Sequence, residues 1–404
     1  MAGKLWNKNF ILLLQGSAVS TLGDLMYSVA IGYWVYENTG SKALMGVMSA
    51  ISMFVTMFLS PFSGSVVDKC NRKWVLVLGD LFQGAIMIAV GVLAFGDNLN
   101  VSIVLIAAFL ASLGGVFYSP AASTVLIDII PRDDIVRGQS LFSGVNSTIN
   151  TVGSAVSGVV VAFLGVPFII VINGLSNVYA AISELFVSVP KTANQGDSIS
   201  ISGILRDLKT AISEIFSDPH LKLFIPCMLI INLLGSGPFS LLLPFTMEKG
   251  FSVEQYGYLM SIWTVAALCS SLLLGVIKFS PKARFWILAL GFSLSSVSLV
   301  FTFLSENFIL MAALAFVSGF LNAAGNSIFS ASLMLALPEA NRGAILGFIS
   351  SASVGGSAIS SVLYGVLGDL FPLYIVFAVG QLISLIPMLT LSFNKRTREF
   401  ITSH

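Results

Sequence analysis

The sequence predicts an all-α integral membrane protein in which twelve transmembrane helices form two six-helix halves. Of the 404 residues, 56% are hydrophobic and only 10% are charged, and the mean hydropathy is +0.94. A soluble core could not cover so much apolar surface. A transmembrane helix needs about 20 predominantly apolar residues, and the chain contains twelve such segments separated by polar breaks.

These twelve segments are the predicted spans. They lie at residues 9–36, 43–67, 74–96, 101–130, 138–164, 166–189, 221–247, 255–277, 284–305, 307–337, 343–368 and 371–393. Backbone groups cannot remain unpaired in lipid, and the segments lack the alternation of apolar and polar residues that barrel strands show. Each segment is therefore expected to be a helix.

The predicted spans divide around one long polar connection. Residues 1–190 hold the first six spans, residues 191–220 form a cytoplasmic linker, and residues 221–404 hold the other six spans and a short cytoplasmic tail. Apolar residues recur at helical spacing in the linker, which predicts an amphipathic helix on the membrane surface. This helix is either a plain tether or a binding site for a regulatory partner.

The basic residues predict the orientation. With a cytoplasmic amino terminus, only Lys42 and Lys249 of the 20 basic residues lie on the outer side of the membrane. The other 18 obey the positive-inside rule, which places both termini in the cytoplasm. A missed or invented span would scatter this charge, so the distribution also supports the count of twelve.

The two halves are predicted to be related by duplication. The sequence PRDDIVRG at 131–138 follows the fourth span, and PEANRG at 338–343 follows the tenth. Further along, GSAVS at 153–157 matches GSAIS at 356–360. Transporters built from repeats place their substrate site near the membrane midplane, between the repeats.

Asp24 is the only charged residue between Phe10 and Tyr36. A carboxylate near the middle of a span costs roughly 2.5–3.5 kcal/mol to insert, so a function is expected for it. Helical spacing places it on a polar stripe that belongs against a water-filled cavity and contains Ser17, Ser20, Thr21, Asp24, Tyr27 and Ser28. Asp24 is therefore a candidate for binding a proton or a cationic substrate. The alternative is a static aspartate that fixes the first span against a neighbour.

Polar and aromatic side chains on other spans extend this candidate cavity. Its predicted lining residues are Ser20, Tyr27, Asn146, Asn150, Asn232, Ser236, Phe239, Asn322 and Asn326. Aromatic rings such as Tyr27 and Phe239 are suited to stacking on a ligand or contacting a cation. The alternative for each ring taken singly is ordinary packing.

The loop after the second span combines an acid with clustered bases. Arg72 and Lys73 are suited to holding this loop at the anionic cytoplasmic surface, and Asp68 to pairing with a base or a helix amino end. We expect a latch that closes the cytoplasmic side, formed by Gly64, Asp68, Arg72, Lys73, Asp80 and Asp128. Asp80, Asp128 and Glu184 are expected to reach interfacial water or basic residues at the cytoplasmic side. The alternative is positive-inside topology alone.

This loop resembles the signature loop of the major facilitator superfamily, with Asn71 where a second glycine is usual. The twelve spans, the long central loop and the repeat extend the resemblance over essentially the whole chain. Residues 20–41 and 141–158 resemble most the bacterial drug-efflux branch, which includes macrolide exporters and the enterobactin exporter. The resemblance implies the major facilitator fold, a monomer and the bacterial cytoplasmic (inner) membrane.

Two departures from the family pattern bear on mechanism. Exporters often carry a G-P-x-x-G-G run in the fifth helix, whereas this chain keeps Gly153 and Gly158 but has Ser154 in place of the proline. These small residues also fit tight helix packing alone. In addition, Ala111 stands where many proton-coupled relatives have an arginine, and no lysine or arginine lies deep in any span. Proton coupling must therefore depend on carboxylates.

Together these features predict a secondary active transporter that exports lipophilic cationic or neutral compounds, drug-like or macrolide-like, by proton antiport and alternating access. Its expected partners are a small lipophilic substrate, protons and the bilayer, without nucleic acid, metal or cofactor. A siderophore exporter and a lipid or lysolipid exporter of the same fold are alternatives. A membrane enzyme or sensor is disfavoured, because the sequence has no phosphate-binding loop, HExxH motif or nucleophile elbow.

Overall fold

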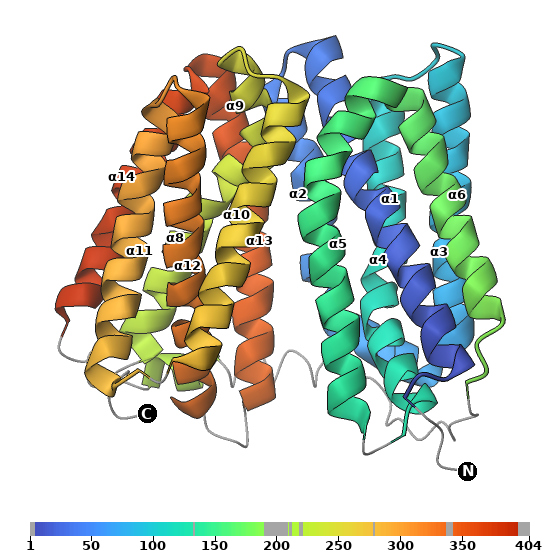
Figure 1. Ribbon diagram of the computed structural model, residues 1–404, viewed down its shortest axis with the longest axis horizontal. Helices are drawn as coiled ribbons and strands as arrows, with labels where there is room; N and C mark the ends of the chain where they lie inside the picture. Colours follow the sequence, from blue (N-terminus) through green and yellow to red (C-terminus); the bar gives the residue numbers. More distant parts are fainter. Residues whose placement is uncertain are drawn as a thin grey trace. The chain divides into compact units, whose positions relative to one another are not determined.

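A computed structural model of the chain describes residues 5–131, 134–189, 209, 212–217, 221–277, 279–336 and 342–394. Within these ranges all the regular elements are helices (Figure 1). They are α1 Lys8–Thr39, α2 Lys42–Lys69, α3 Arg72–Phe95, α4 Val101–Ile129, α5 Ile135–Leu164, α6 Val166–Leu185, α8 Leu221–Ser240, α9 Leu242–Glu248, α10 Val253–Val276, α11 Pro281–Leu304, α12 Phe308–Ala336, α13 Arg342–Leu370 and α14 Leu373–Phe393.

The helices agree with the predicted all-α membrane fold. Eleven of those described are long and apolar enough to cross a membrane, or twelve if the two bent pieces of α5 count as one span. The seventh predicted span is divided into α8 and the short α9. The helix predicted in the linker falls mostly outside the described residues, because only 209 and 212–217 of the linker are described.

Capping side chains and glycines set several helix ends. The Asn7 side chain accepts a hydrogen bond from the Phe10 amide at the start of α1, at 2.9 Å, and so pairs one of the free amides of the first turn. Gly40 ends α1 with φ of 62°, a left-handed conformation that glycine adopts without strain. These two residues set where α1 begins and ends.

A proline explains the break between α8 and α9. Pro238 has no amide hydrogen, so the carbonyl of Leu234, four residues earlier, cannot receive its usual helical hydrogen bond. The Tyr364 hydroxyl of α13 donates to that carbonyl instead, at 2.7 Å. Gly237 makes room for the tyrosine ring, because a Cβ there would overlap it. The proline thus breaks the helix and creates an acceptor that joins α8 to α13.

The chain forms two compact units. Unit 1 comprises Met1–Gly40, Ile51–Ile199 and Val253–Gly257, and unit 2 comprises Ser41–Ala50, Ser200–Ser252 and Tyr258–His404. Helices α2 and α10 each contribute residues to both units. The sequence boundaries proposed above, at 190 and 221, remain a prediction.

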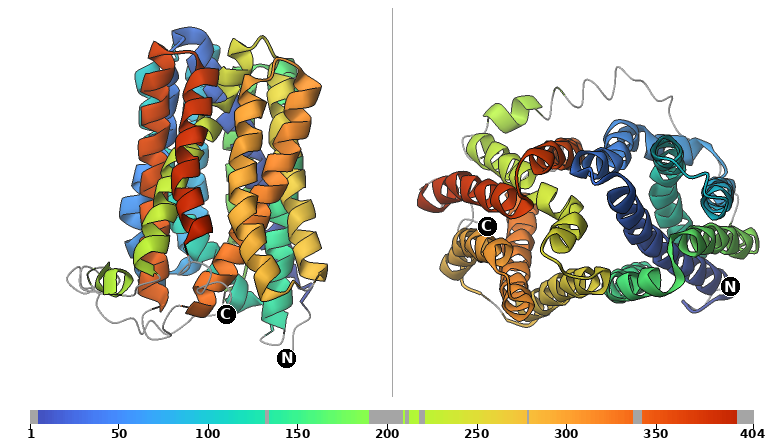
Figure 2. Two further views of the ribbon diagram at one scale, coloured as in Figure 1. Left: turned by 90° about the vertical axis from the view of Figure 1, so that its left-hand side faces the viewer. Right: turned by 90° about the horizontal axis from the view of Figure 1, so that it is seen from above.

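In unit 1, α6 packs against both α3 and α1 (Figures 1 and 2). A Cβ at Gly84 of α3 would lie 2.9 Å from the Gly174 carbonyl oxygen of α6. Gly91 meets Val171 in the same way, one level further along both helices. Small residues at these positions let the two backbones approach closely, which is a common way to associate helices in lipid.

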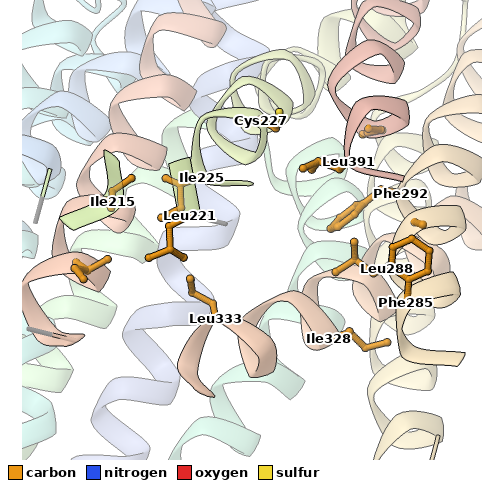
Figure 3. Packing of buried hydrophobic residues seen from close by; sticks show 13 residues of the cluster. Ile215, Leu221, Ile225, Cys227, Phe285, Leu288, Phe292, Ile328, Leu333 and Leu391 are labelled. Carbon is orange, nitrogen blue, oxygen red and sulfur yellow. The ribbon is translucent and has the colours of Figure 1, made fainter. Parts of the chain in front are cut away.

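Unit 2 is organised around α11, which packs against α12 and α14. Its buried side chains form a contiguous apolar cluster with neighbouring helices (Figure 3). In that cluster Phe285, Leu288 and Phe292 of α11 meet Ile328 of α12 and Leu391 of α14. The cluster forms one part of the unit, and a cavity lies beside it.

Lys42 and Lys249, the two basic residues expected on the outer side of the membrane, are both held by contacts in unit 2. Lys42 Nζ lies 2.8 Å from Glu248 Oε2 and 2.9 Å from the Gly368 carbonyl oxygen. Lys249 donates to the Ser305 carbonyl oxygen and lies over the Phe245 ring. Burial lowers the pKa of Lys249, although Glu306 and Glu248 oppose this effect. These contacts explain how both cations are accommodated there.

We expect Gly84→Ala to destabilise the protein, because the added methyl group would press on the backbone of α6. Overpacking of this kind costs about 1–3 kcal/mol. The matched control is Gly144→Ala in α5, where a Cβ meets nothing within 4 Å. Thermal unfolding of the purified protein in detergent should show a lower midpoint for Gly84→Ala only. Equal midpoints for the two variants would contradict the close approach of α3 and α6.

Candidate functional site

Unit 2 contains a cavity of about 340 Å³ between its helices. Helices α8, α10, α11, α12, α13 and α14 all contribute lining residues. Five residues predicted from the sequence to line a substrate cavity lie on its wall, namely Asn232, Ser236, Phe239, Asn322 and Asn326. The structure therefore brings together predicted residues from two separate spans.

The cavity wall is uncharged but rich in hydrogen-bonding groups. Asn326 donates to the side-chain oxygen of Asn322 at 2.8 Å, and Ser357 donates to that of Asn232 at 2.9 Å. Ser236 Oγ has no hydrogen-bond partner in the described part of the chain. None of the described lining residues is acidic or basic. The wall therefore suits a ligand that is neutral where it meets this unit.

Aromatic and sulfur-containing side chains supply the rest of the wall. Phe239 and Trp263 meet edge to face, with ring centroids 4.7 Å apart. Phe329, Met228 and Met388 also line the cavity. Rings offer flat apolar contact area, and methionine adapts to differently shaped ligands. Such a wall is typical of a binding site that accepts more than one lipophilic compound.

Gln381 of α14 is a lining residue that the sequence analysis missed. It is 2% exposed, and its Nε2 has no hydrogen-bond partner among the described residues. A buried amide without a partner is unfavourable, so its donor is available to a ligand or water in the cavity. One signal could have revealed it, because Gln381 is the only amide side chain in α14.

In unit 1, Asp24 lies midway along α1 and is exposed. The amide side chains of Asn173 and Asn177 on α6 interact with it. No basic side chain forms an ion pair with Asp24 in the part of the chain that the structure describes. Gly23 allows this arrangement, because a Cβ there would overlap Ser176. The aspartate is thus accessible and has polar but uncharged neighbours.

The other predicted cavity residues of unit 1 lie on α1 and α5 and differ in burial and in hydrogen bonding. Ser20 is buried and donates to the Ser17 carbonyl oxygen within α1. The Tyr27 hydroxyl has no hydrogen-bond partner among the described residues. On α5, Asn150 donates to the Asn146 carbonyl oxygen at 2.9 Å. Ser20 therefore contributes to helix packing more than to an open cavity surface.

The small-residue motif of α5 lies at a bend. The segments Arg137–Gly153 and Val156–Leu164 meet at 51°. Gly153 approaches Leu25 of α1, and Gly158 approaches the Val253 backbone at the start of α10. Both glycines therefore lie where a neighbouring helix comes close to α5. The structure does not describe the side chain of Ser154.

Part of the predicted latch is present at one end of unit 1. Arg72 Nη1 lies 2.7 Å from Asp128 Oδ2, which joins the start of α3 to the end of α4. Lys73 donates to the Leu185 carbonyl oxygen at the end of α6, at 2.7 Å, where a cation is favoured. Gly64 has open space around it, and the side chain of Asp68 is not described.

The predicted positions of Asp80 and Glu184 near interfacial water are wrong. Asp80 is 2% exposed and Glu184 is 1% exposed. Glu184 Oε1 accepts a hydrogen bond from the Tyr118 hydroxyl at 3.2 Å, and neither residue forms an ion pair in the described part of unit 1. The close packing of α3 on α6 encloses both side chains. The position of an acid along its span could not reveal this burial, because it does not show which face of α3 is covered by α6.

We expect the Arg72–Asp128 pair to stabilise unit 1. Each single variant, Arg72→Gln or Asp128→Asn, should lower the free energy of unfolding by about 1–2 kcal/mol, since both side chains are mostly buried and hydrogen-bonded. In the double variant the loss should be clearly less than the sum of the two single losses, as measured by thermal unfolding. Strict additivity would show that the two residues act independently.

Comparison with known proteins gives the same architecture. Residues 13–350 and 225–399 match the model of the Major Facilitator Superfamily. Macrolide efflux protein A of Streptococcus pyogenes is 26% identical over 194 residues, which cover 48% of each chain. The multidrug efflux pump Tap of Mycobacterium bovis is 26% identical over 160 residues, or 38% of each chain. The aligned region thus spans about half the length, or less, of these relatives.

Solved structures support the fold. A bacterial homologue of the human lysosomal transporter Spinster superposes with a TM-score of 0.73 at 13% identity, covering 99% of this chain and 98% of the other. The nucleoside transporter NupG gives a TM-score of 0.76 at 13% identity, covering 94% and 97%. Both are transporters, and the family model matches most of this sequence. The chain therefore belongs to the Major Facilitator Superfamily and has the fold of its multi-pass membrane transporters.

Proposed function

We propose that this protein exports lipophilic cationic or neutral compounds, drug-like or macrolide-like, in exchange for protons. The observation that carries the proposal is the uncharged, aromatic and amide-lined cavity of unit 2. Its volume of about 340 Å³ is near the lower end of ligand pockets. It would therefore hold a compact compound or one arm of a larger one.

The chemistry of the cavity favours this substrate class over a siderophore. A polyanionic ligand needs basic side chains or a metal to offset its charge, and the described lining residues supply none. Phe239 and Trp263 instead offer apolar contact area. The names of the relatives, a macrolide efflux protein and a multidrug efflux pump, agree with the same class.

Asp24 is the proposed coupling residue. It is exposed and pairs with no described basic residue, so its carboxylate is available to a proton or to a cationic group. A proton bound there lowers the attraction for a cationic substrate, and a bound cation opposes protonation. Competition for one carboxylate during alternating access gives exchange of substrate for proton. The proposed setting is a monomer in the bacterial inner membrane with both termini in the cytoplasm.

Replacing Asp24 should uncouple the transporter. Addition of a cationic substrate such as ethidium to the purified wild type should release protons, and Asp24→Asn should release none. In the wild type the affinity for the cation should rise with pH, by at most about tenfold per pH unit for one competing proton, whereas in Asp24→Asn it should not change.

The control is Asp97→Asn, which alters an exposed carboxylate just beyond the end of α3. It should behave as the wild type. Substrate-driven proton release that persists unchanged in Asp24→Asn would disprove the assigned coupling role.

The aromatic wall should determine affinity. Trp263→Ala should raise the Kd for a radiolabelled macrolide about tenfold, because the loss of a buried aromatic contact typically costs at least about 1.4 kcal/mol. Trp286→Ala is the matched control, since Trp286 is an exposed residue of α11 that does not line the cavity. Equal affinities of the two variants in equilibrium binding would place the binding site elsewhere.

A further inference from the structure

Two buried acids in unit 1 have no function in the scheme above. Asp80 of α3 and Glu184 of α6 are 2% and 1% exposed. Asp80 Oδ2 and Glu184 Oε2 have no hydrogen-bond partner among the described residues. A buried carboxylate that is charged and unpaired is strongly unfavourable. This pair therefore requires something that neutralises it.

The register of the helices places the two acids at the same level. Gly91 of α3 lies against Val171 of α6, and Gly84 lies against Val178, so the two helices run antiparallel. Asp80 is four residues before Gly84, and Glu184 is six residues after Val178. At 1.5 Å per residue, both lie roughly 6–9 Å beyond the Gly84–Val178 contact. The charge of Glu184 acts on Asp80 at this level.

The groups facing the pair supply no positive charge. From α4, the Tyr118 hydroxyl donates to Glu184. On α1, the acid Asp24 acts on Asp80, and Lys8, the one basic residue of that helix, is exposed at its start. The charged residue of α5, Arg137, is exposed at the start of that helix.

The nearby bases at the end of unit 1 are engaged elsewhere. Arg72 pairs with Asp128, and Lys73 donates to the Leu185 carbonyl oxygen. Two acids side by side in such a site cannot both remain ionised.

A metal ion does not fit this site. No group of three or more histidine, cysteine or acidic side chains with the geometry of a metal site occurs among the described residues. Calcium requires six to eight oxygen ligands, and magnesium requires six. Two carboxylates and one phenol fall well short of that number. A proton is the one ligand that needs a single oxygen and neutralises one charge.

The same register places the pair between Asp24 and one end of unit 1. Gly23 lies against Ser176 of α6, so Asp24 is about eight residues, or roughly 12 Å, from the level of Glu184. Beyond Glu184, the Ser188 amide donates to the Asn9 side chain at 3.1 Å, at the start of α1. The pair thus lies between the middle of α1 and the end of unit 1 at which α1 begins.

We propose that Asp80 and Glu184 together bind one proton and form a relay between Asp24 and the end of unit 1 at which α1 begins. In each transfer an O–H bond breaks on one carboxylic acid and another forms on a neighbouring carboxylate, directly or through water, so charge and protons balance. The relay rests on the coupling role proposed for Asp24, whereas proton binding by the pair does not.

Proton binding is tested by infrared spectroscopy, in which a protonated carboxyl group has its own carbonyl band. The background is Asp24→Asn, so that Asp24 cannot contribute. At neutral pH this protein should show a protonated carboxyl band that is absent from Asp24→Asn/Asp80→Asn/Glu184→Gln. The band should persist when the background is combined with Asp97→Asn, the exposed control.

Isotopic labelling makes the test independent of variant folding. The Asp24→Asn protein is labelled with carbon-13 at the carboxyl carbons of aspartate and glutamate. If the band comes from a carboxyl group, the heavier carbon should move it to lower frequency. Absence of a protonated carboxyl band from the background protein would overturn the proposal. Persistence of the band in the folded triple variant, confirmed by its helical circular dichroism, would also overturn it.

The relay is tested by transport in an Asp24-containing protein. Asp80→Asn and Glu184→Gln should each slow proton-driven efflux from proteoliposomes by about 100-fold, as is usual when a proton-transfer group is lost. Equilibrium binding of the macrolide should stay unchanged. Wild-type efflux rates in both variants would overturn the relay. Wild-type coupling in Asp24→Asn, with the infrared result as expected, would instead disprove the role of Asp24 and leave proton binding by the pair intact.

Discussion

The close approach of α6 to α1 and α3 is the contact on which unit 1 depends. Lipid gives apolar helices no reason to associate, so association requires backbones that fit closely. Gly23, Gly84 and Gly174 provide that fit, and a Cβ at any of them would meet a neighbouring helix within 3 Å. The same contact encloses Asp80 and Glu184 and brings Asn173 and Asn177 to Asp24. The packing of α6 on α1 and α3 therefore both holds this unit together and sets the surroundings of its three acids.

The two units differ in the chemistry of their interiors. Unit 1 contains carboxylates and a partly buried ion pair, Arg72–Asp128. The cavity of unit 2 is lined by amides, hydroxyls, rings and methionines. Acids suit the binding of protons and cations, and an uncharged wall suits lipophilic compounds. In the proposed function, coupling and recognition are assigned mainly to different units.

Proline and glycine shape the helices where side chains must meet. Pro238 leaves the Leu234 carbonyl free, and Tyr364 donates to it, which fixes α8 against α13 beside Ser236 and Phe239 of the cavity wall. In α5, Ser157 donates to the Gly153 carbonyl oxygen at the 51° bend, a bond that often accompanies bending. Individual residues therefore specify the break between α8 and α9 and the bend in α5.

The sequence by itself determined the class of fold, because lipid requires long apolar helices and each must be visible as a continuous run. It also indicated Asp24, since one charge in an apolar span is conspicuous, and it indicated Asn232, Asn322 and Asn326 through helical spacing. Tertiary structure alone decided that Gln381 joins their cavity and that Asp80 and Glu184 are buried together. A sequence pattern gives the face on which a side chain lies, but the neighbouring helix that covers this face follows only from packing.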